Sequence, residues 1–192
     1  MIRAMLIGRK GVGKNTIASI IQNRRPEVQL GAFADALKKD VAMMLNHSLS
    51  ISKLPGKTLP MDVDALDAYR NLLRPIWQWY GTEWGRARDN DVWIRRFHDE
   101  RGFAQNMIIT DCRFQNEADY GKRNGYVLVR VTGPNWREPS PLGEDVHASE
   151  QELLDISAAI TISNEGSLAM LTELVHGMLI PYIEKNSFEG SW

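Results

Sequence analysis

The sequence predicts an α/β fold in which helices flank a mostly parallel sheet of five strands. Short apolar runs alternate with helical patterns, and a glycine-rich turn joins the first run to the first helix. The expected strands are 2–7, 28–33, 106–110, 126–132 and 158–163. The expected helices are 14–24, 34–46, 75–81, 90–101, 114–123 and 167–184. The third of these should begin at Pro75, because the residue before a proline avoids the helical conformation.

Composition and charge narrow the class of protein. The chain has 192 residues, which suits one domain with a proper core, and its 43% hydrophobic and 24% charged residues are ordinary for a soluble protein. A net charge of −1 argues against a dedicated nucleic-acid binder. The single cysteine, Cys112, fits a reducing compartment, and no apolar run approaches the roughly 18 residues that span a bilayer. We therefore expect a cytoplasmic protein that has neither a membrane nor a nucleic-acid partner and carries no signal peptide.

The turn after the first expected strand is typical of a phosphate-binding loop, or P-loop. Residues 8–16 read GRKGVGKNT, and the candidates for nucleotide binding are Gly11, Val12, Gly13, Lys14, Asn15 and Thr16. Glycines let backbone N–H groups converge on one anion, and Lys14 adds a charge for the outer phosphates. The usual pattern has Ser or Thr directly after the lysine, whereas here Asn15 stands there and Thr16 follows. The alternative is a chance cluster of glycine and lysine in a surface turn.

Two stretches do not fit the alternation of strands and helices. Residues 47–69 are rich in proline and aspartate, and residues 133–149 contain three prolines and two glycines. Loops this long within a domain are usually functional covers or disordered segments. In a nucleotide-binding protein they suggest a single P-loop domain over 1–192, with a substrate-binding excursion at 47–89 and a lid-like loop at 133–149.

The expected strand 106–110 leads directly into polar residues. In P-loop proteins an adjacent strand ends with a carboxylate near magnesium, so Asp111 is the candidate metal ligand beside Thr16. Asp111 could instead, or also, cap the next helix, because aspartate favours that position. Arg113 lies at the carboxyl end of a central strand, where its planar fork would suit a phosphate, and a plain surface arginine is the alternative.

Residues 70–97 contain four of the six tryptophans, interleaved with arginines. Two interpretations remain open: a surface that stacks a base and grips a phosphate, or aromatic helix faces in the core with arginines reaching water. We expect most of these tryptophans to be core and one or two residues to face the substrate. The candidates in this block are Arg70, Arg74, Trp77, Gln78, Thr82 and Arg86.

Five further candidates lie elsewhere. Asp35 and Lys38 follow the second expected strand, where Asp35 could cap its helix and Lys38 could reach an acceptor phosphate. Arg137 is the lone arginine of the 133–149 loop and is the natural donor if a lid clamps phosphate. Glu150 belongs to a polar cluster with His147, for which metal binding has no support. Asn164 follows the last strand, where it could border an adenine ring or cap a turn.

Several sequence blocks, taken in order, resemble the deoxynucleoside monophosphate kinases of the bacteriophage type. The blocks are GRKGVGKNT, FADALK, WQWYGTEWGR with DVWIRRF, ITDCRFQNEAD and ITISNEGSLAML. The resemblance implies a P-loop NTPase three-layer fold and transfer of the γ-phosphoryl group of ATP to a deoxynucleoside monophosphate, with Mg²⁺. It also implies that Gly11 to Thr16 hold ATP and that Arg137 belongs to the lid. The resemblance further implies that the acceptor site is lined by Asp35, Lys38, Gln78, Thr82, Arg86, Arg113 and Glu117.

One position departs from this family, which often has an arginine directly after its fourth strand. Here Thr132 stands at that position, and Arg130 comes two residues earlier, where we expect it to lie within the strand. Animal-type phosphomevalonate kinases share the glycine loop and the Asp-x-Arg after strand three, so they are the alternative within the kinases.

Two classes outside the kinases are the alternatives: an ATP-dependent regulatory module, and a binder of single-stranded nucleic acid, against which the net charge of −1 argues. The helix 167–184 could be core or the interface of a homodimer.

Overall fold

The computed structural model describes residues 1–51, 69–102, 104–133 and 148–188. These residues form two compact units, Met1–Ala32 with Phe103–Trp192, and Phe33–Gly102. The first unit contains β1 Arg3–Ile7, α1 Lys14–Arg24, β2 Gln29–Gly31, β3 Met107–Cys112, α6 Gln115–Arg123, β4 Val127–Thr132, α7 Ala148–Asp155, β5 Ile160–Ser163, α8 Leu168–Leu174, the π-helical segment η2 Val175–Leu179 and α9 Ile180–Asn186. The second contains α2 Ala34–Ile51, α4 Arg70–Gln78, the π-helical segment η1 Trp79–Arg86 and α5 Val92–Arg101.

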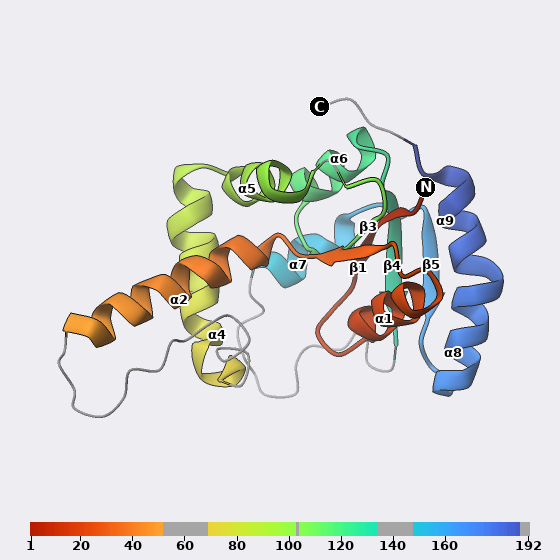
Figure 1. The fold of residues 1–192 in the computed structure, drawn as a ribbon, viewed down its shortest axis with the longest axis horizontal. Helices are drawn as coiled ribbons and strands as arrows, with labels where there is room; N and C mark the ends of the chain where they lie inside the picture. Colours follow the sequence, from red (N-terminus) through yellow and green to blue (C-terminus); the bar gives the residue numbers. More distant parts are fainter. Residues whose placement is uncertain (52–68, 103, 134–147, 189–192) are drawn as a thin grey trace. The chain divides into compact units, whose positions relative to one another are not determined.

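The sheet of the first unit has five strands in the order β2-β3-β1-β4-β5, and every neighbouring pair is parallel (Figure 1). Parallel strands place all their carboxyl ends at one edge, where ligands bind in open sheets of this kind. All five residues of β1 are buried, as a central strand covered on both faces requires. The α/β fold with a parallel five-stranded sheet is therefore confirmed, and it is consistent with the kinases of the P-loop NTPase fold.

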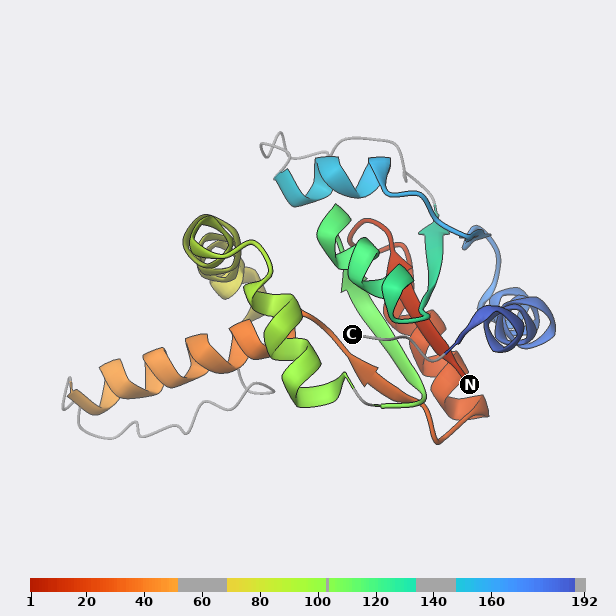
Figure 2. The same cartoon turned by 90° about the horizontal axis from the view of Figure 1, so that it is seen from above.

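Helices cover both faces of this sheet (Figures 1 and 2). On one face α1 and the run α8–α9 bury the side chains of alternate residues, among them Ala4 and Leu6 of β1 and Ile2 just before it. On the other face α6 lies so close to β1 that a Cβ added to Gly121 would meet Met5. This close helix–sheet packing fixes the loops that leave the carboxyl ends of the strands.

The helix expected to begin at Pro75 instead begins at Arg70 and runs through the proline, so that prediction was wrong. Pro75 lies in the second turn, where its missing N–H removes one helical hydrogen bond. Leu73 and Trp77, on either side of it, pack against Ala42 and Leu45 of α2. Burial of these apolar side chains offsets the lost hydrogen bond, and this compensation is tertiary.

Other boundaries also differ from the predicted ones. The helix expected over 34–46 continues to Ile51 as α2. The end of the loop expected over 133–149 is helical, because α7 begins at Ala148, while residues 134–147 lie outside the described part of the chain. The expected helix 167–184 is a continuous run from Leu168 to Asn186 with η2 in its middle. Pro181 lies in the first turn of α9, directly after η2. A local widening into a π-helical turn is a common way for a helix to accommodate a proline.

Candidate nucleotide site at the carboxyl edge of the sheet

The loop between β1 and α1 has the backbone shape that the glycine pattern predicts. Gly11 and Gly13 have φ angles of 84° and 98°, in the left-handed region that side chains disfavour. Gly8 is needed for another reason, since a Cβ there would lie 2.6 Å from the carbonyl oxygen of Val131 on β4. The three glycines therefore let the loop curl tightly against the edge of the sheet.

Lys14 places its ammonium group against this loop. Its Nζ donates hydrogen bonds to the carbonyl oxygens of Gly8 at 2.5 Å and Arg9 at 2.8 Å. These contacts hold a positive charge beside the curled backbone. A cation fixed next to converging amides suits the outer phosphates of a nucleotide.

The N-terminus of α1 adds its own backbone donors to the loop. Gly13 is the N-cap residue, and no side chain caps the helix there. The first N–H groups of a helix lack partners within the helix and favour an anion. Asn15 and Thr16 lie in this first turn and are exposed, so both side chains are accessible to a ligand.

Asp111 is the penultimate residue of β3 and is half-buried. It does not cap the following helix, because the N-cap residue of α6 is Phe114; the capping alternative was therefore wrong. β3 pairs with β1, and Cys112 is in register with Ile7, which directly precedes the P-loop. Asp111 thus lies near the carboxyl end of β3, beside the strand that leads into the P-loop. This is the position expected of a carboxylate near a nucleotide-bound metal.

The donors near the P-loop suit Mg²⁺. The described residues contain no group of three or more His, Cys, Asp or Glu side chains that could hold a metal by themselves. Mg²⁺ usually takes one or two protein oxygens and completes its shell with phosphates and water. A hydroxyl from Thr16 and a carboxylate from Asp111 fit that limited demand.

Glu117 supports the segment that carries Arg113. Its Oε2 accepts hydrogen bonds from the backbone N–H groups of Arg113 at 2.8 Å and Phe114 at 3.2 Å. The glutamate is only 4% exposed, so its carboxylate lies within the protein at the start of α6. Glu117 thus orients the backbone of Arg113, a role that differs from the expected place on the acceptor side.

The helix α7 contributes a contact that the sequence analysis missed. Glu152 of α7 accepts a hydrogen bond from the backbone N–H of Gln115 at 2.8 Å. The carboxylates of Glu117 and Glu152 therefore occupy the backbone N–H groups of Arg113, Phe114 and Gln115. The sequence around Glu152 contains no pattern that predicts this contact, because the partner residue lies 37 positions earlier in the chain.

Arg130 lies within β4, as predicted, two residues before Thr132. Its guanidinium donates to the carbonyl oxygens of Leu154 and Ile156 at the end of α7. Burial lowers the pKa of Arg130 from its ordinary value. The described contacts of Arg130 thus anchor α7 to the sheet.

Asn164 follows β5 and touches the P-loop directly. Its Nδ2 donates to the carbonyl oxygen of Val12 at 3.0 Å, and its backbone N–H donates to Thr132 at 2.8 Å. A Cβ on Gly13 would run into the Asn164 amide. The structure therefore brings together the P-loop and the ends of β4 and β5.

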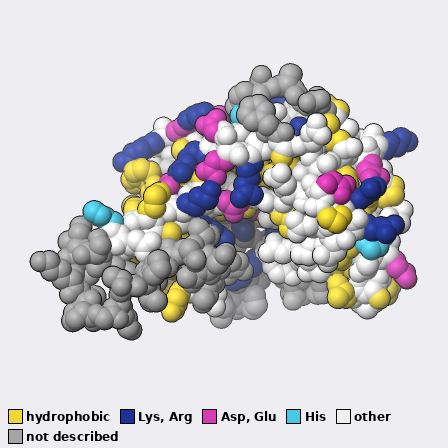
Figure 3. Space-filling view, in the orientation of Figure 1, with side chains coloured by type: hydrophobic (Ala, Val, Ile, Leu, Met, Phe, Trp, Pro, Cys, Tyr) yellow, Lys and Arg dark blue, Asp and Glu magenta, His cyan; other side chains and the backbone are white. Residues whose placement is uncertain are grey.

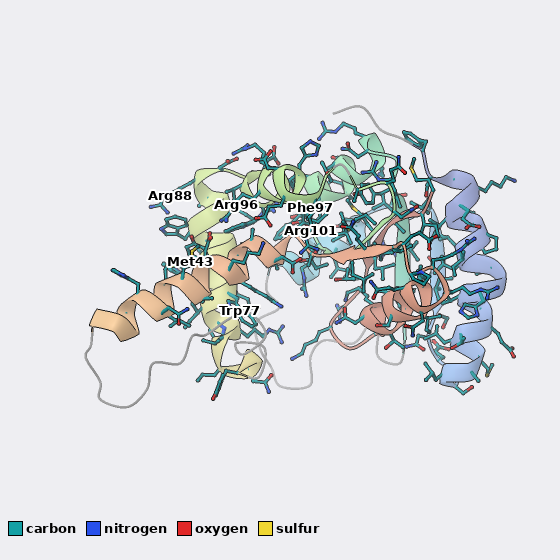
Figure 4. The ribbon with its side chains drawn as sticks, viewed as in Figure 1. Met43, Trp77, Arg88, Arg96, Phe97 and Arg101 are labelled. Atoms are coloured by element: carbon teal, nitrogen blue, oxygen red, sulfur yellow. The ribbon has the colours of Figure 1, made fainter. Side chains whose placement is uncertain are left out.

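Several predicted acceptor-side residues lie in the second unit, and two of them meet there. The Lys38 ammonium lies 5.3 Å from the ring centroid of Trp77, which Figure 4 labels. The Trp77 indole nitrogen is buried and makes no hydrogen bond to the described residues. Asp35 faces Arg101 at 4.0 Å. The half-buried candidates Arg74, Gln78, Thr82 and Arg86 lie on α4 and η1.

The second unit also holds a polar network that the sequence analysis missed. Asp40 of α2 pairs with Arg96 of α5 and accepts a hydrogen bond from the Tyr80 hydroxyl at 3.2 Å. Burial, followed by the charge of Asp40, raises the pKa of Tyr80, while the hydrogen bond to Asp40 raises the pKa of Arg96. This network ties α2, η1 and α5 together. Figure 3 shows basic and acidic side chains intermingled over this part of the molecule.

The expectation that most tryptophans of the 70–97 block are core was wrong. Trp93 is buried and donates to the Gly81 carbonyl at 2.8 Å, whereas Trp79 and Trp84 are 55% and 38% exposed. Trp84 stacks on Tyr80 with ring centroids 4.8 Å apart, and the guanidinium of Arg88 lies 4.2 Å from its ring. The stacking of a guanidinium on an aromatic ring is favourable, and here it stabilises the exposed Trp84 side chain at the surface.

Three candidates cannot be placed in the site. Arg137 lies outside the described residues. Arg70 belongs to α4 and Glu150 to α7, but their side chains are not among those described. Their proposed contacts with substrate stay predictions.

Comparison with known proteins gives one informative similarity. No family model matches the chain. A protein of Acanthamoeba polyphaga mimivirus named "Putative deoxynucleotide monophosphate kinase" is 28% identical to it over 173 residues. The match covers 82% of this chain and 85% of that protein. This similarity supports a nucleotide kinase, and the parallel α/β fold is consistent with the P-loop NTPase-like kinases. The bacteriophage subtype stays a prediction.

Among the helices in the described part of the chain, none combines the length and the apolar character that crossing a bilayer demands.

Proposed function

We propose that this protein is a kinase that transfers the γ-phosphoryl group of ATP to a deoxynucleoside 5′-monophosphate and releases the diphosphate. The observation that carries the proposal is the curled loop at residues 8–13, with the Lys14 ammonium held against it at the head of α1. The similarity to the mimivirus protein supports the choice of a nucleotide as acceptor.

The P-loop is assigned to the phosphates of ATP. Backbone N–H groups of Gly11 to Gly13 and of the first turn of α1 would surround the β-phosphate, and Lys14 would neutralise charge on the β- and γ-phosphates. Phosphoryl transfer needs little covalent chemistry from a protein. Most of the rate comes from positioning the two reactants and stabilising charge in the transition state.

Thr16 and Asp111 are assigned to Mg²⁺. When bound, the ion would supply positive charge that neutralises part of the charge on the phosphates. The role of the protein here is to hold the Thr16 hydroxyl at the head of α1 and the Asp111 carboxylate at the end of β3.

Arg113 of the first unit is assigned to a phosphate of the acceptor. The Arg113 fork suits a phosphate, and Glu117 holds its backbone. In the second unit, the pairing of Lys38 with Trp77 offers a cation beside an aromatic ring, a combination that suits a nucleotide. Gln78, Thr82 and Arg86 are the other proposed acceptor contacts, and Arg137 remains the proposed lid residue. The single-domain organisation, the excursion at 47–89, the lid-like loop at 133–149 and the homodimer likewise stay proposals.

A panel of acceptors tests the proposal. The purified protein would be incubated with ATP, Mg²⁺ and, one at a time, deoxynucleoside monophosphates, ribonucleoside monophosphates and phosphomevalonate, and the diphosphate products would be separated by chromatography. We expect a deoxynucleoside diphosphate to form. Slow ATP hydrolysis that ignores every acceptor would favour a regulatory module, and turnover of phosphomevalonate alone would favour a different small-molecule kinase.

Two lysines of the same loop supply a matched pair of variants. Lys14→Ala removes the charge held against the loop, and we expect turnover to fall by at least about a hundredfold with the fold intact. Lys10→Ala removes an exposed charge four residues earlier and should leave turnover within about threefold of the native rate. Near-normal turnover of the Lys14→Ala variant in an ADP-release assay would remove the mechanism.

A further inference from the structure

Asn164 is held at the edge of the sheet by its backbone. Ser163, the last residue of β5, is in register with Thr132 of β4, and the Asn164 N–H donates to the Thr132 carbonyl oxygen at 2.8 Å. The parallel ladder thus continues one residue beyond β5. Asn164 therefore starts its side chain from a fixed point beside the P-loop.

The Asn164 side chain reaches the P-loop through a hydrogen bond that spans 152 residues of sequence. Its Nδ2 lies 3.0 Å from the carbonyl oxygen of Val12. Only the nitrogen of the amide can face a carbonyl oxygen favourably, so this contact also fixes which way the amide points. The absence of a side chain on Gly13 makes the approach possible, because a Cβ there would collide with the Asn164 amide.

This contact fixes the direction of a neighbouring amide. The Val12–Gly13 peptide bond is trans, and a trans peptide is planar with its C=O and N–H pointing in opposite directions. Because the Val12 carbonyl points toward Asn164, the Gly13 N–H points away from it. Rotation of this peptide plane would turn the Gly13 donor aside and would break the hydrogen bond to Asn164.

We propose that Asn164 is a positioning residue that locks the Val12–Gly13 peptide so that the Gly13 N–H faces a phosphate of the bound nucleotide. This inference rests on the proposed P-loop function and assigns to Asn164 a task directed at the phosphate chain. It differs from the expected place of Asn164 beside an adenine ring, because the described contact of its Nδ2 is with the loop backbone.

The two roles predict different ligand dependence. A residue that orients a phosphate-binding amide affects every ligand that carries the phosphate chain, including inorganic tripolyphosphate. A residue that contacts the nucleoside affects ATP and leaves tripolyphosphate unchanged. Binding of both ligands to the native protein and its variants, measured by titration calorimetry, therefore separates the roles.

Three variants isolate the Asn164 side chain. Asn164→Ala removes the donor, and Asn164→Asp keeps the size of the side chain but replaces the donor with a carboxylate. Ser163→Asp adds the same charge at the exposed neighbouring residue and leaves the hydrogen bond to Val12 in place. Thermal unfolding of each variant checks its fold, and the isosteric Asp variant keeps the test valid if the Ala variant is unstable.

We expect both Asn164 variants to bind ATP and tripolyphosphate more weakly by the same factor, roughly tenfold, as loss of one oriented hydrogen bond implies. Hydrogen exchange of the peptide that contains residues 8–16 should also accelerate in these variants without ligand. The Ser163→Asp variant should lose less affinity than Asn164→Asp and keep the native exchange rate.

Each other outcome overturns a defined part of the reasoning. Loss of ATP affinity with unchanged tripolyphosphate affinity would make Asn164 a nucleoside contact and would overturn the positioning role. Native affinities in both Asn164 variants would overturn it as well. If the native protein bound neither ligand, the proposed kinase function would fail first, and that result is distinguishable from the other two.

Discussion

The buried carboxylate of Glu117 offers a sharp test of how the region around Arg113 is built. It accepts two backbone hydrogen bonds, at 2.8 Å from Arg113 and 3.2 Å from Phe114. Hydrogen bonds to a charged group contribute about 1.5–3 kcal/mol each, so the loss of both in Glu117→Ala should lower the free energy of unfolding by about 3–6 kcal/mol. Glu117→Gln keeps an acceptor oxygen but loses the charge, and about 1–2 kcal/mol should be lost.

Urea unfolding followed by tryptophan fluorescence, with thermal unfolding beside it, measures this effect. For a chain of this size the Ala variant should melt roughly 6–24 °C below the native protein. Glu173→Ala on α8 removes an exposed acid and should change stability by less than about 0.5 kcal/mol. If Glu117→Ala unfolded at the native urea midpoint, the carboxylate would not be holding the start of α6 and the reasoning would be refuted.

Three further predictions follow from particular contacts. Arg130→Met should cost about 1–2 kcal/mol of stability in urea unfolding, because two carbonyls at the end of α7 lose their donor, and native stability would contradict this. Gly13→Ala should bind ATP at least about tenfold more weakly in titration calorimetry, since its φ of 98° strains any side chain and its Cβ would meet Asn164. Burial raises the pKa of Cys112 well above its ordinary value, so the thiol stays protonated at neutral pH and should react with a thiol reagent only after unfolding. Stability from this thiol is complete below its ordinary pKa and declines as the pH rises past it, and rapid labelling of the folded protein would contradict the burial.

The local sequence was sufficient for the sheet and for the curled glycine loop that follows β1. The expected strand 126–132 corresponds to β4, and the expected helix 14–24 to α1, because apolar runs and capping residues act over a few neighbouring positions. The predicted loop over 8–16 is present, since Gly11 and Gly13 need only their own backbone angles to create it. The errors at Pro75 and at Trp84 have a different origin, because packing between α2 and α4, and stacking on Tyr80, decided them.

The sequence by itself therefore determined that a parallel sheet presents a glycine loop and Lys14 at its carboxyl edge. The tertiary structure alone decided what supports that edge: Glu117 turned inward, Arg130 holding α7, and Asn164 bonded to Val12. The physical reason is that a local pattern sets backbone conformation within a few residues. A hydrogen bond between side chain and backbone 152 positions apart exists only after the strands have paired.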